Sequence, residues 1–203
     1  MKSIQWILLT IFGRIDVTHK WQQDFLLEMF ELIFSIQGRV NYMNLARFSK
    51  YNESTFRRNF KKFFDWLNFN MEIMRIAGFK FSKKSAHEII GAIDCSYLPK
   101  SGKKTFGLDS FYSGVAGRNK KGLEISLLCL INVEKAKAWA LDVVQTPAKL
   151  STKEGGIKQY TRINFYLEQI LDLLPQLQYI RYFVADGFYA KKKVFACLVM
   201  LKK

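Results

Sequence analysis

Two aspartates, Asp94 and Asp186, each close a short run of β-branched and aromatic residues. The runs, at 88–94 and 179–187, have the length and the flanking turn residues of buried strands. If the two strands are parallel neighbours, both carboxylates lie at one rim of the sheet. Carboxylates about 4 Å apart repel by roughly 4 kcal/mol at an effective dielectric of about 20. A divalent cation removes that cost, and oxygen ligands suit Mg²⁺ or Mn²⁺. The alternative is that both aspartates cap turns.

The segments between the two aspartates predict how they are positioned. Residues 123–133 and 138–144 are apolar runs joined by a short turn, so with the run at 88–94 they predict an antiparallel meander. Residues 161–174 have helical periodicity. A helix that connects two strands of one sheet returns the chain parallel and with a right-handed crossover. The order therefore predicts an α/β fold in which the last strand lies beside the first.

Lysines flank both aspartates. The segment after Asp94 is expected to be a turn, because it contains Pro99 and Gly102, and residues 106–118 are expected to be an irregular excursion. The lysines that could meet a phosphodiester backbone there are Lys100, Lys103, Lys104, Lys191 and Lys192. The alternative is a solvated basic surface without a partner.

A second group of basic residues lies in the N-terminal third. Residues 53–67 place bulky apolar side chains on one helical face, and Asn52 is suited to cap that helix. A shorter helix at 41–50 precedes the turn, which gives the layout of a helix-turn-helix. The basic residues beside the apolar face are Arg57, Arg58, Lys61 and Lys62. We expect them to contact DNA; the alternative is a solvated face in which Lys61 pairs with Asp65.

The charge of the whole chain agrees with a polyanionic partner. The 203 residues carry a formal net charge of +15, which favours nucleic acid or an acidic surface. The apolar start of the chain is too short to span a bilayer, so no membrane association is expected and the location is expected to be the cytoplasm, at the bacterial nucleoid. We expect a helical DNA-binding domain at 1–80 and an α/β domain at 85–203.

The residues around the two aspartates resemble those of a known family. Asp94-Cys-Ser-Tyr-Leu-Pro-Lys-Ser-Gly, Tyr112-Ser-Gly and Val184-Ala-Asp186-Gly-Phe-Tyr are similar to the first two signature blocks of insertion-sequence transposases of the DDE class. The resemblance implies a ribonuclease H-like core in which two Mg²⁺ ions support attack on DNA phosphodiesters by water and then by a 3′-hydroxyl. It implies that Asp94 bridges both ions and that Asp186 binds one. The implied partners are transposon terminal inverted repeats, target DNA, and a second copy or a full-length transposase.

The resemblance also implies a third carboxylate, a glutamate on a later helix. Residues 187–203 contain no Asp or Glu. The acidic residues that precede Asp186 do not fit that role in chain order; they are Glu88, Glu124, Glu134 and Asp142. We therefore expect a truncated, incomplete ribonuclease H-like core with little or no strand-transfer activity. One alternative is a DNA-binding fragment that occupies transposon ends or inhibits the full-length enzyme. The other is a metal-dependent nuclease of the same fold, unrelated to transposition.

Overall fold

The computed structural model describes residues 4–15, 19–79, 89–102, 105–150, 160–191 and 194. The chain divides into two compact units, residues 1–79 and 80–203, which are described separately below. Three of the lysines expected to meet DNA or flank the aspartates, Lys103, Lys104 and Lys192, lie outside the described residues, as does most of the segment after Lys191.

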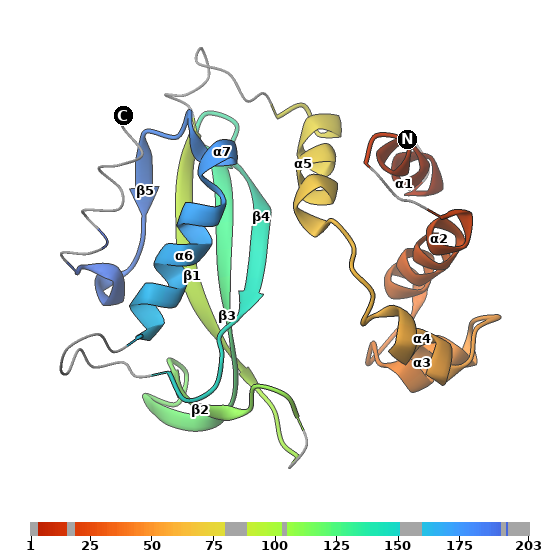
Figure 1. Ribbon diagram of the computed structural model, residues 1–203, viewed down its shortest axis with the longest axis horizontal. Coiled ribbons are helices and arrows are strands. Elements are labelled where there is room, and N and C mark those ends of the chain that lie inside the picture. Colours follow the sequence, from red (N-terminus) through yellow and green to blue (C-terminus); the bar gives the residue numbers. More distant parts are fainter. Residues whose placement is uncertain are drawn as a thin grey trace. The chain divides into compact units, whose positions relative to one another are not determined.

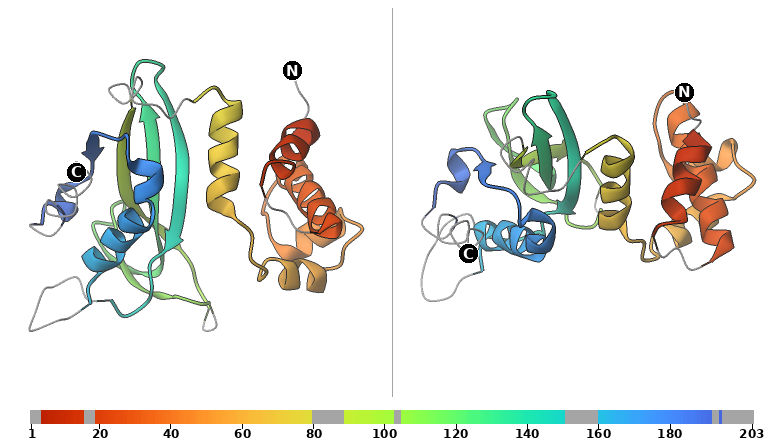
Figure 2. Two further views of the ribbon diagram at one scale, coloured as in Figure 1. Left: turned by 45° about the horizontal axis from the view of Figure 1, so that its top comes forward. Right: turned by 90° about the horizontal axis from the view of Figure 1, so that it is seen from above.

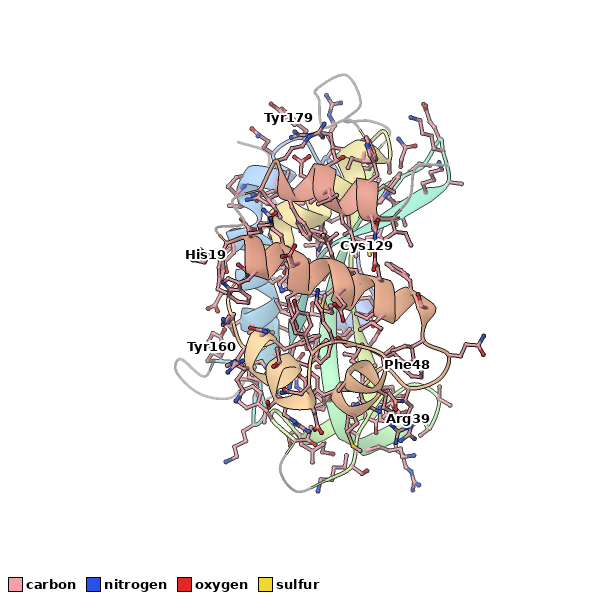
Figure 3. All side chains as sticks on the ribbon, turned by 90° about the vertical axis from the view of Figure 1, so that its right-hand side faces the viewer. His19, Arg39, Phe48, Cys129, Tyr160 and Tyr179 are labelled. Carbon is pink, nitrogen blue, oxygen red and sulfur yellow. The ribbon has the colours of Figure 1, made fainter. Side chains whose placement is uncertain are left out.

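The first unit is helical (Figure 1). Its helices are α1 (Ile4–Phe12), α2 (Lys20–Ser35), α3 (Tyr42–Arg47), α4 (Glu53–Asn59) and α5 (Trp66–Ile76). Apolar side chains from all five helices form one core, with Ile11, Phe56 and Leu45 almost fully buried. Phe48 follows α3 and is exposed (Figure 3). The core is rich in phenylalanine, and several of its rings pack edge to face. Such ring pairs add stability beyond that from the burial of apolar surface.

The predicted continuous helix at 53–67 is wrong. Asn52 caps α4 as expected, since its side chain accepts from the Thr55 backbone N–H at 2.9 Å, but α4 ends at Asn59. The side chain of Asp65 accepts from the Asn68 N–H at 3.0 Å and so begins a new helix, α5. A carboxylate that caps a helix start competes with continuation of the preceding helix. Asp65 is therefore committed to α5 rather than paired with Lys61.

The second unit contains a mixed sheet. Its strands are β1 (Ile89–Pro99), β2 (Asp109–Ser113), β3 (Arg118–Asn132), β4 (Lys137–Gln145) and β5 (Tyr182–Val184). Strand β3 pairs antiparallel with β1, β2 and β4, and β5 pairs parallel with β1. This confirms the predicted α/β class, with the meander and the parallel return of a ribonuclease H-like core.

The crossover from β4 to β5 contains α6 (Arg162–Asp172) and α7 (Leu174–Leu177). Helix α6 lies along one face of the sheet in every view (Figure 2). Thr161 and Asn164 form a capping box that fixes its start, and Tyr160 precedes that cap (Figure 3). The buried residues of α6 include Ile163, Tyr166 and Ile170. Helix α6 is joined to β3 by two buried hydrogen bonds, from Tyr166 to Glu124 and from Ser126 to Gln169. This packing sets the position of the crossover on the sheet.

Two expectations for the second unit are wrong. Strand β1 does not end at Asp94, because β3 pairs with it along its whole length, from Ile89 to Pro99. The segment 106–118 is not wholly irregular: β2 pairs with the start of β3 over Asp109 to Ser113. The glycines and aromatic residues of this segment favour a loop, but part of it, β2, pairs with the basic first residues of β3. Strands β2 and β3 therefore form a hairpin.

No helix in the described part of the chain is long and apolar enough to cross a membrane.

Candidate functional site

The register of β1 and β5 brings the two aspartates to one level of the sheet. The last parallel pair is Ala92 with Val184, and Asp94 and Asp186 each lie two residues further along. Asp94 is still on β1 and so projects to the same face as Ala92, whereas Asp186 lies beyond the end of β5, in the turn that follows. Strand β1 continues past Asp94, but its neighbour β5 ends before Asp186. The sheet edge at which Asp94 is exposed is therefore formed by the end of β5 and not by the end of β1. The crossover thus positions both carboxylates from distant parts of the sequence.

The pairing of β1 with β5 depends on a glycine. Gly91 lies opposite Phe183, and a Cβ built on Gly91 would lie 2.5 Å from the Phe183 ring. Any larger residue would therefore push the ring or the strand away, since carbon atoms in contact are separated by about 3.5–4.0 Å. Because β5 is only three residues long and ends two residues before Asp186, a shift of β5 would also shift Asp186.

Asp94 and Asp186 line one open cavity of about 610 Å³ in the second unit. The remaining walls come from β1, the β2–β3 hairpin, α6 and the turn after β5. The polar residues of the lining are Cys95, Asp109, Ser110, Tyr112, Asn119, Glu124, Arg162, Tyr166 and Tyr189. A cavity of this size, walled by carboxylates and a few precisely held polar groups, has the character of a substrate site.

Both aspartates retain a free carboxylate oxygen. Asp94 Oδ1 accepts from the Cys95 N–H at 2.8 Å, and Asp186 Oδ1 accepts from the Phe188 N–H at 2.9 Å. The Oδ2 atoms have no hydrogen-bond partner within the described segments. Each side chain is thus oriented by the backbone with one oxygen left for a ligand. Mg²⁺ is commonly held by one or two carboxylates plus waters and substrate phosphates, so this donor set fits it.

Asp109 and Glu124 also line the cavity but are committed elsewhere. Asp109 accepts from the Lys149 N–H at 2.6 Å, which holds the pKa of Asp109 below its ordinary value. Glu124 accepts from the Tyr166 hydroxyl at 2.5 Å and lies 3.7 Å from the Arg162 guanidinium. Among the described residues, no group of three His, Cys, Asp or Glu side chains is arranged to hold a metal ion.

A buried hydroxyl cluster supports the floor of the cavity. The thiol of Cys95 and the hydroxyl of Tyr189 share a hydrogen bond of 2.8 Å, and Thr146 Oγ1 lies 3.1 Å from the Tyr166 hydroxyl. Burial raises the pKa of Cys95 and of both tyrosines. These groups therefore stay protonated at neutral pH, and Cys95 lacks the thiolate that a nucleophile needs. Tyr166 donates a hydrogen bond to Glu124, and the contact of Cys95 with Tyr189 joins β1 to the turn after Asp186.

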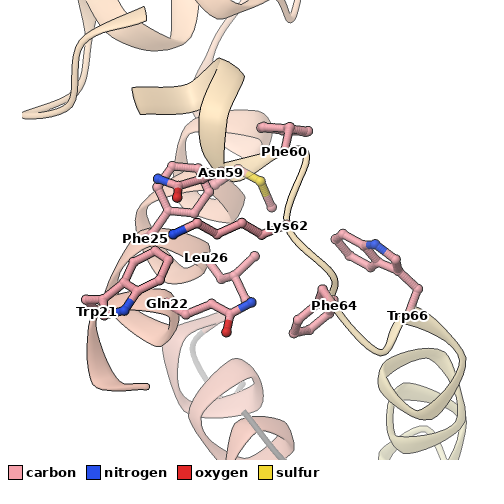
Figure 4. Close-up of a pocket in the computed structure, with 10 residues that line it drawn as sticks. Trp21, Gln22, Phe25, Leu26, Asn59, Phe60, Lys62, Phe64 and Trp66 are labelled. Carbon is pink, nitrogen blue, oxygen red and sulfur yellow. The ribbon is translucent and has the colours of Figure 1, made fainter. Parts of the chain in front are cut away.

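The basic residues predicted to contact DNA in the first unit differ in their availability. Arg57 forms an ion pair with Glu53 on the same helix. Lys62 lies outside any helix, and its ammonium stacks 3.7 Å from the Trp21 ring centroid at the edge of a small aromatic pocket of about 100 Å³ (Figure 4). Arg58 and Lys61 are exposed, and within the described segments they have no ion pair.

In the second unit, Lys100 follows β1 and Lys191 follows the 3-10 turn η2 (Gly187–Tyr189), and both are exposed. Sequence reasoning missed Glu124, Arg162 and Tyr166 as cavity residues. No signal for Glu124 is present in the sequence, because Leu123, Ile125 and Leu127 alternate with it and favour the opposite phase of β3 as the buried one, whereas in the structure Glu124 is buried.

Comparison with known proteins identifies the class to which this fold and site belong. A family described as DDE superfamily endonuclease matches residues 21–199. The chain belongs to this family. No curated protein and no solved structure matches it significantly. Endonucleases of this superfamily act on DNA and generally use divalent metal ions, in keeping with the all-oxygen donor pair described above.

Proposed function

We propose that the chain is a transposase-type DNA endonuclease in which Asp94 and Asp186 hold divalent metal ions, Mg²⁺ or Mn²⁺. The observation that carries the proposal is the β1–β5 register, which sets the two aspartates at one level on one cavity. Each aspartate has one oxygen fixed by a backbone N–H and one left free. A bound divalent ion would supply Lewis acidity for phosphodiester cleavage.

The residues around the pair have supporting roles. Tyr166 orients Glu124 through a hydrogen bond and the Arg162 guanidinium offsets its charge, so Glu124 repels an incoming phosphate less strongly. The Tyr189 hydroxyl contacts the Cys95 thiol and so ties the turn after Asp186 to the strand that carries Asp94. These contacts help to hold the two aspartates in place, and phosphoryl chemistry depends on such preorganisation.

The substrate proposed is transposon-end DNA, and full strand transfer would require one more carboxylate. Residues 187–203 do not supply it, and Glu124 is held by Tyr166 and Arg162. The polypeptide 1–203 is therefore expected to bind DNA and metal but to join DNA strands poorly. A DNA-binding role without catalysis, at transposon ends or in a complex with a full-length transposase, is the second candidate.

An assay with purified protein 1–203 separates the candidates. The protein is incubated with duplex DNA that carries the ends of its element, with Mg²⁺ or Mn²⁺, and nicked and joined products are resolved on a gel. Slow, metal-dependent nicking that is lost in Asp94→Asn supports the endonuclease. Binding without any cleavage favours the non-catalytic role, and robust joining contradicts the expected weakness of strand transfer.

A further inference from the structure

The β2–β3 hairpin, residues 109–122, carries an unneutralised positive charge. It includes Arg118, Lys120 and Lys121 and one acidic residue, Asp109, whose carboxylate accepts from the backbone N–H groups of Ser110 and Lys149. All three basic side chains belong to exposed residues, and within the described part of the chain none has an ion-pair partner. This differs from Arg57 in the first unit, whose charge is met by Glu53. The hairpin is thus an unsatisfied cationic surface.

A further lysine adds to the same end of the sheet. The antiparallel ladder of β1 and β3 ends with Pro99 opposite Gly122, so Lys100 and Lys121 follow at adjoining positions. Like charges that face each other across strands are destabilising unless a counter-charge lies between them. The Lys121 carbonyl also accepts from the Tyr97 hydroxyl at 2.7 Å, which fixes the backbone at this point. The arrangement indicates an anionic partner held against a fixed frame.

The base of the hairpin is anchored, while its end is free. Phe111 is fully buried, and the Arg162 guanidinium stacks over its ring with 4.6 Å between Cζ and the centroid. Arg162 Nη2 also donates to the Ser110 carbonyl at 3.3 Å, which ties β2 to α6. Residues 114–121 are all exposed, and Val115 at the turn is completely so. The hairpin therefore presents its basic residues at a defined place.

The hairpin adjoins the cavity that contains the two aspartates. Tyr112 and Asn119 lie opposite each other in the hairpin, and both line that cavity. A polyanion bound along the hairpin would thus lead directly to Asp94 and Asp186.

We propose that the β2–β3 hairpin is a duplex-DNA contact surface in which Arg118, Lys120 and Lys121 bind backbone phosphates beside the cavity. This inference rests on the proposed DNA-directed function. Phosphate contacts fix the position of the duplex and are independent of base sequence. The hairpin therefore positions the scissile strand and does not select the site.

The test compares two charge-matched variants on opposite ends of β3. Lys120→Gln/Lys121→Gln removes two charges from the hairpin, and Lys135→Gln/Lys137→Gln removes two exposed charges from the β3–β4 turn and the first residue of β4. Binding of a duplex of about 30 base pairs is measured by fluorescence anisotropy over a range of salt concentrations. Circular dichroism and a thermal melt confirm that both variants fold.

The hairpin variant should bind about ten-fold more weakly. A plot of log affinity against log salt should be less steep, its negative slope smaller in magnitude by roughly 2, because each phosphate contact contributes about −0.9 to the slope. The control should change affinity less than about two-fold. If wild-type protein binds and both variants are weakened equally, the hairpin inference is wrong while the proposed function stands. If wild-type protein binds no DNA at any salt concentration, the proposed function itself fails.

Discussion

Replacement of Tyr166 by phenylalanine tests whether the buried cluster beneath the cavity stabilises the second unit. The Tyr166 hydroxyl donates to Glu124 at 2.5 Å and lies 3.1 Å from Thr146 Oγ1, and Thr146 is fully buried. Burial raises the pKa of Tyr166, so the hydroxyl stays a donor at neutral pH. Phenylalanine fills the same space but leaves a buried carboxylate with Arg162 alone, at 3.7 Å.

The size of the effect follows from the charge of the acceptor. A hydrogen bond to a charged group contributes about 1.5–3 kcal/mol, and an unsatisfied buried hydroxyl costs about 1 kcal/mol or more. We therefore expect Tyr166→Phe to lower the free energy of unfolding by about 2–3 kcal/mol. The matched control is Tyr160→Phe, because Tyr160 also donates to a carboxylate, Glu168, but at an exposed position. Tyr160→Phe should lower the free energy of unfolding by less than about 0.5 kcal/mol.

Urea denaturation at neutral pH measures both losses, and hydrogen–deuterium exchange of β3 amides assigns the effect to the second unit. A Tyr166→Phe protein that is as stable as Tyr160→Phe, with unchanged protection of β3, would refute the reasoning. It would mean that Glu124 is solvated or paired in some other way.

Two further predictions concern the strands around the site. Gly91→Ala places a methyl group against the Phe183 ring and should displace β5, with little effect on the antiparallel pairing of β1 with β3. The variant should therefore bind Mn²⁺ more weakly than wild type. Equal Mn²⁺ affinity in titrations of variant and wild type would contradict this. Asp109→Asn should lower stability above about pH 4, where the wild-type carboxylate is ionised, and the difference should shrink as the pH falls through the lowered pKa of Asp109. Urea midpoints between neutral and acidic pH measure that difference, and one that grows toward low pH would have the wrong sign.

The sequence sufficed to predict the arrangement of the sheet around the aspartates. The helix at 161–174 lies between apolar runs, and the handedness and direction of such crossovers are nearly invariant, so a parallel return of β5 beside β1 followed. The length of β1 could not be predicted in the same way. The local sequence predicts a strand end at Asp94, but β1 continues to Pro99 because it is paired with β3 over that whole length. Pairing with a distant strand is not visible in local sequence.

Other differences have similar causes. The apolar spacing in 53–67 fits one helix, but the side chain of Asp65 caps a new one, and cap geometry outweighs periodicity over a single turn. Glu124 was set aside because of its order in the chain, although the register of β3 places it on the cavity wall. The DNA-contact roles of the basic residues in the first unit stay predictions, and Arg58 and Lys61 remain available for them.

A metal site shared by Asp94 and Asp186 is central to the proposed function, and Mn²⁺ binding tests it directly. Electron paramagnetic resonance titrations of wild type, Asp94→Asn, Asp186→Asn and the control Asp172→Asn, an exposed position at the end of α6, report free and bound Mn²⁺. Each of the first two variants should bind at least about ten-fold more weakly than wild type, since each removes one of the two ligands, and the control should be unchanged. The same affinity in all four proteins would contradict the shared site.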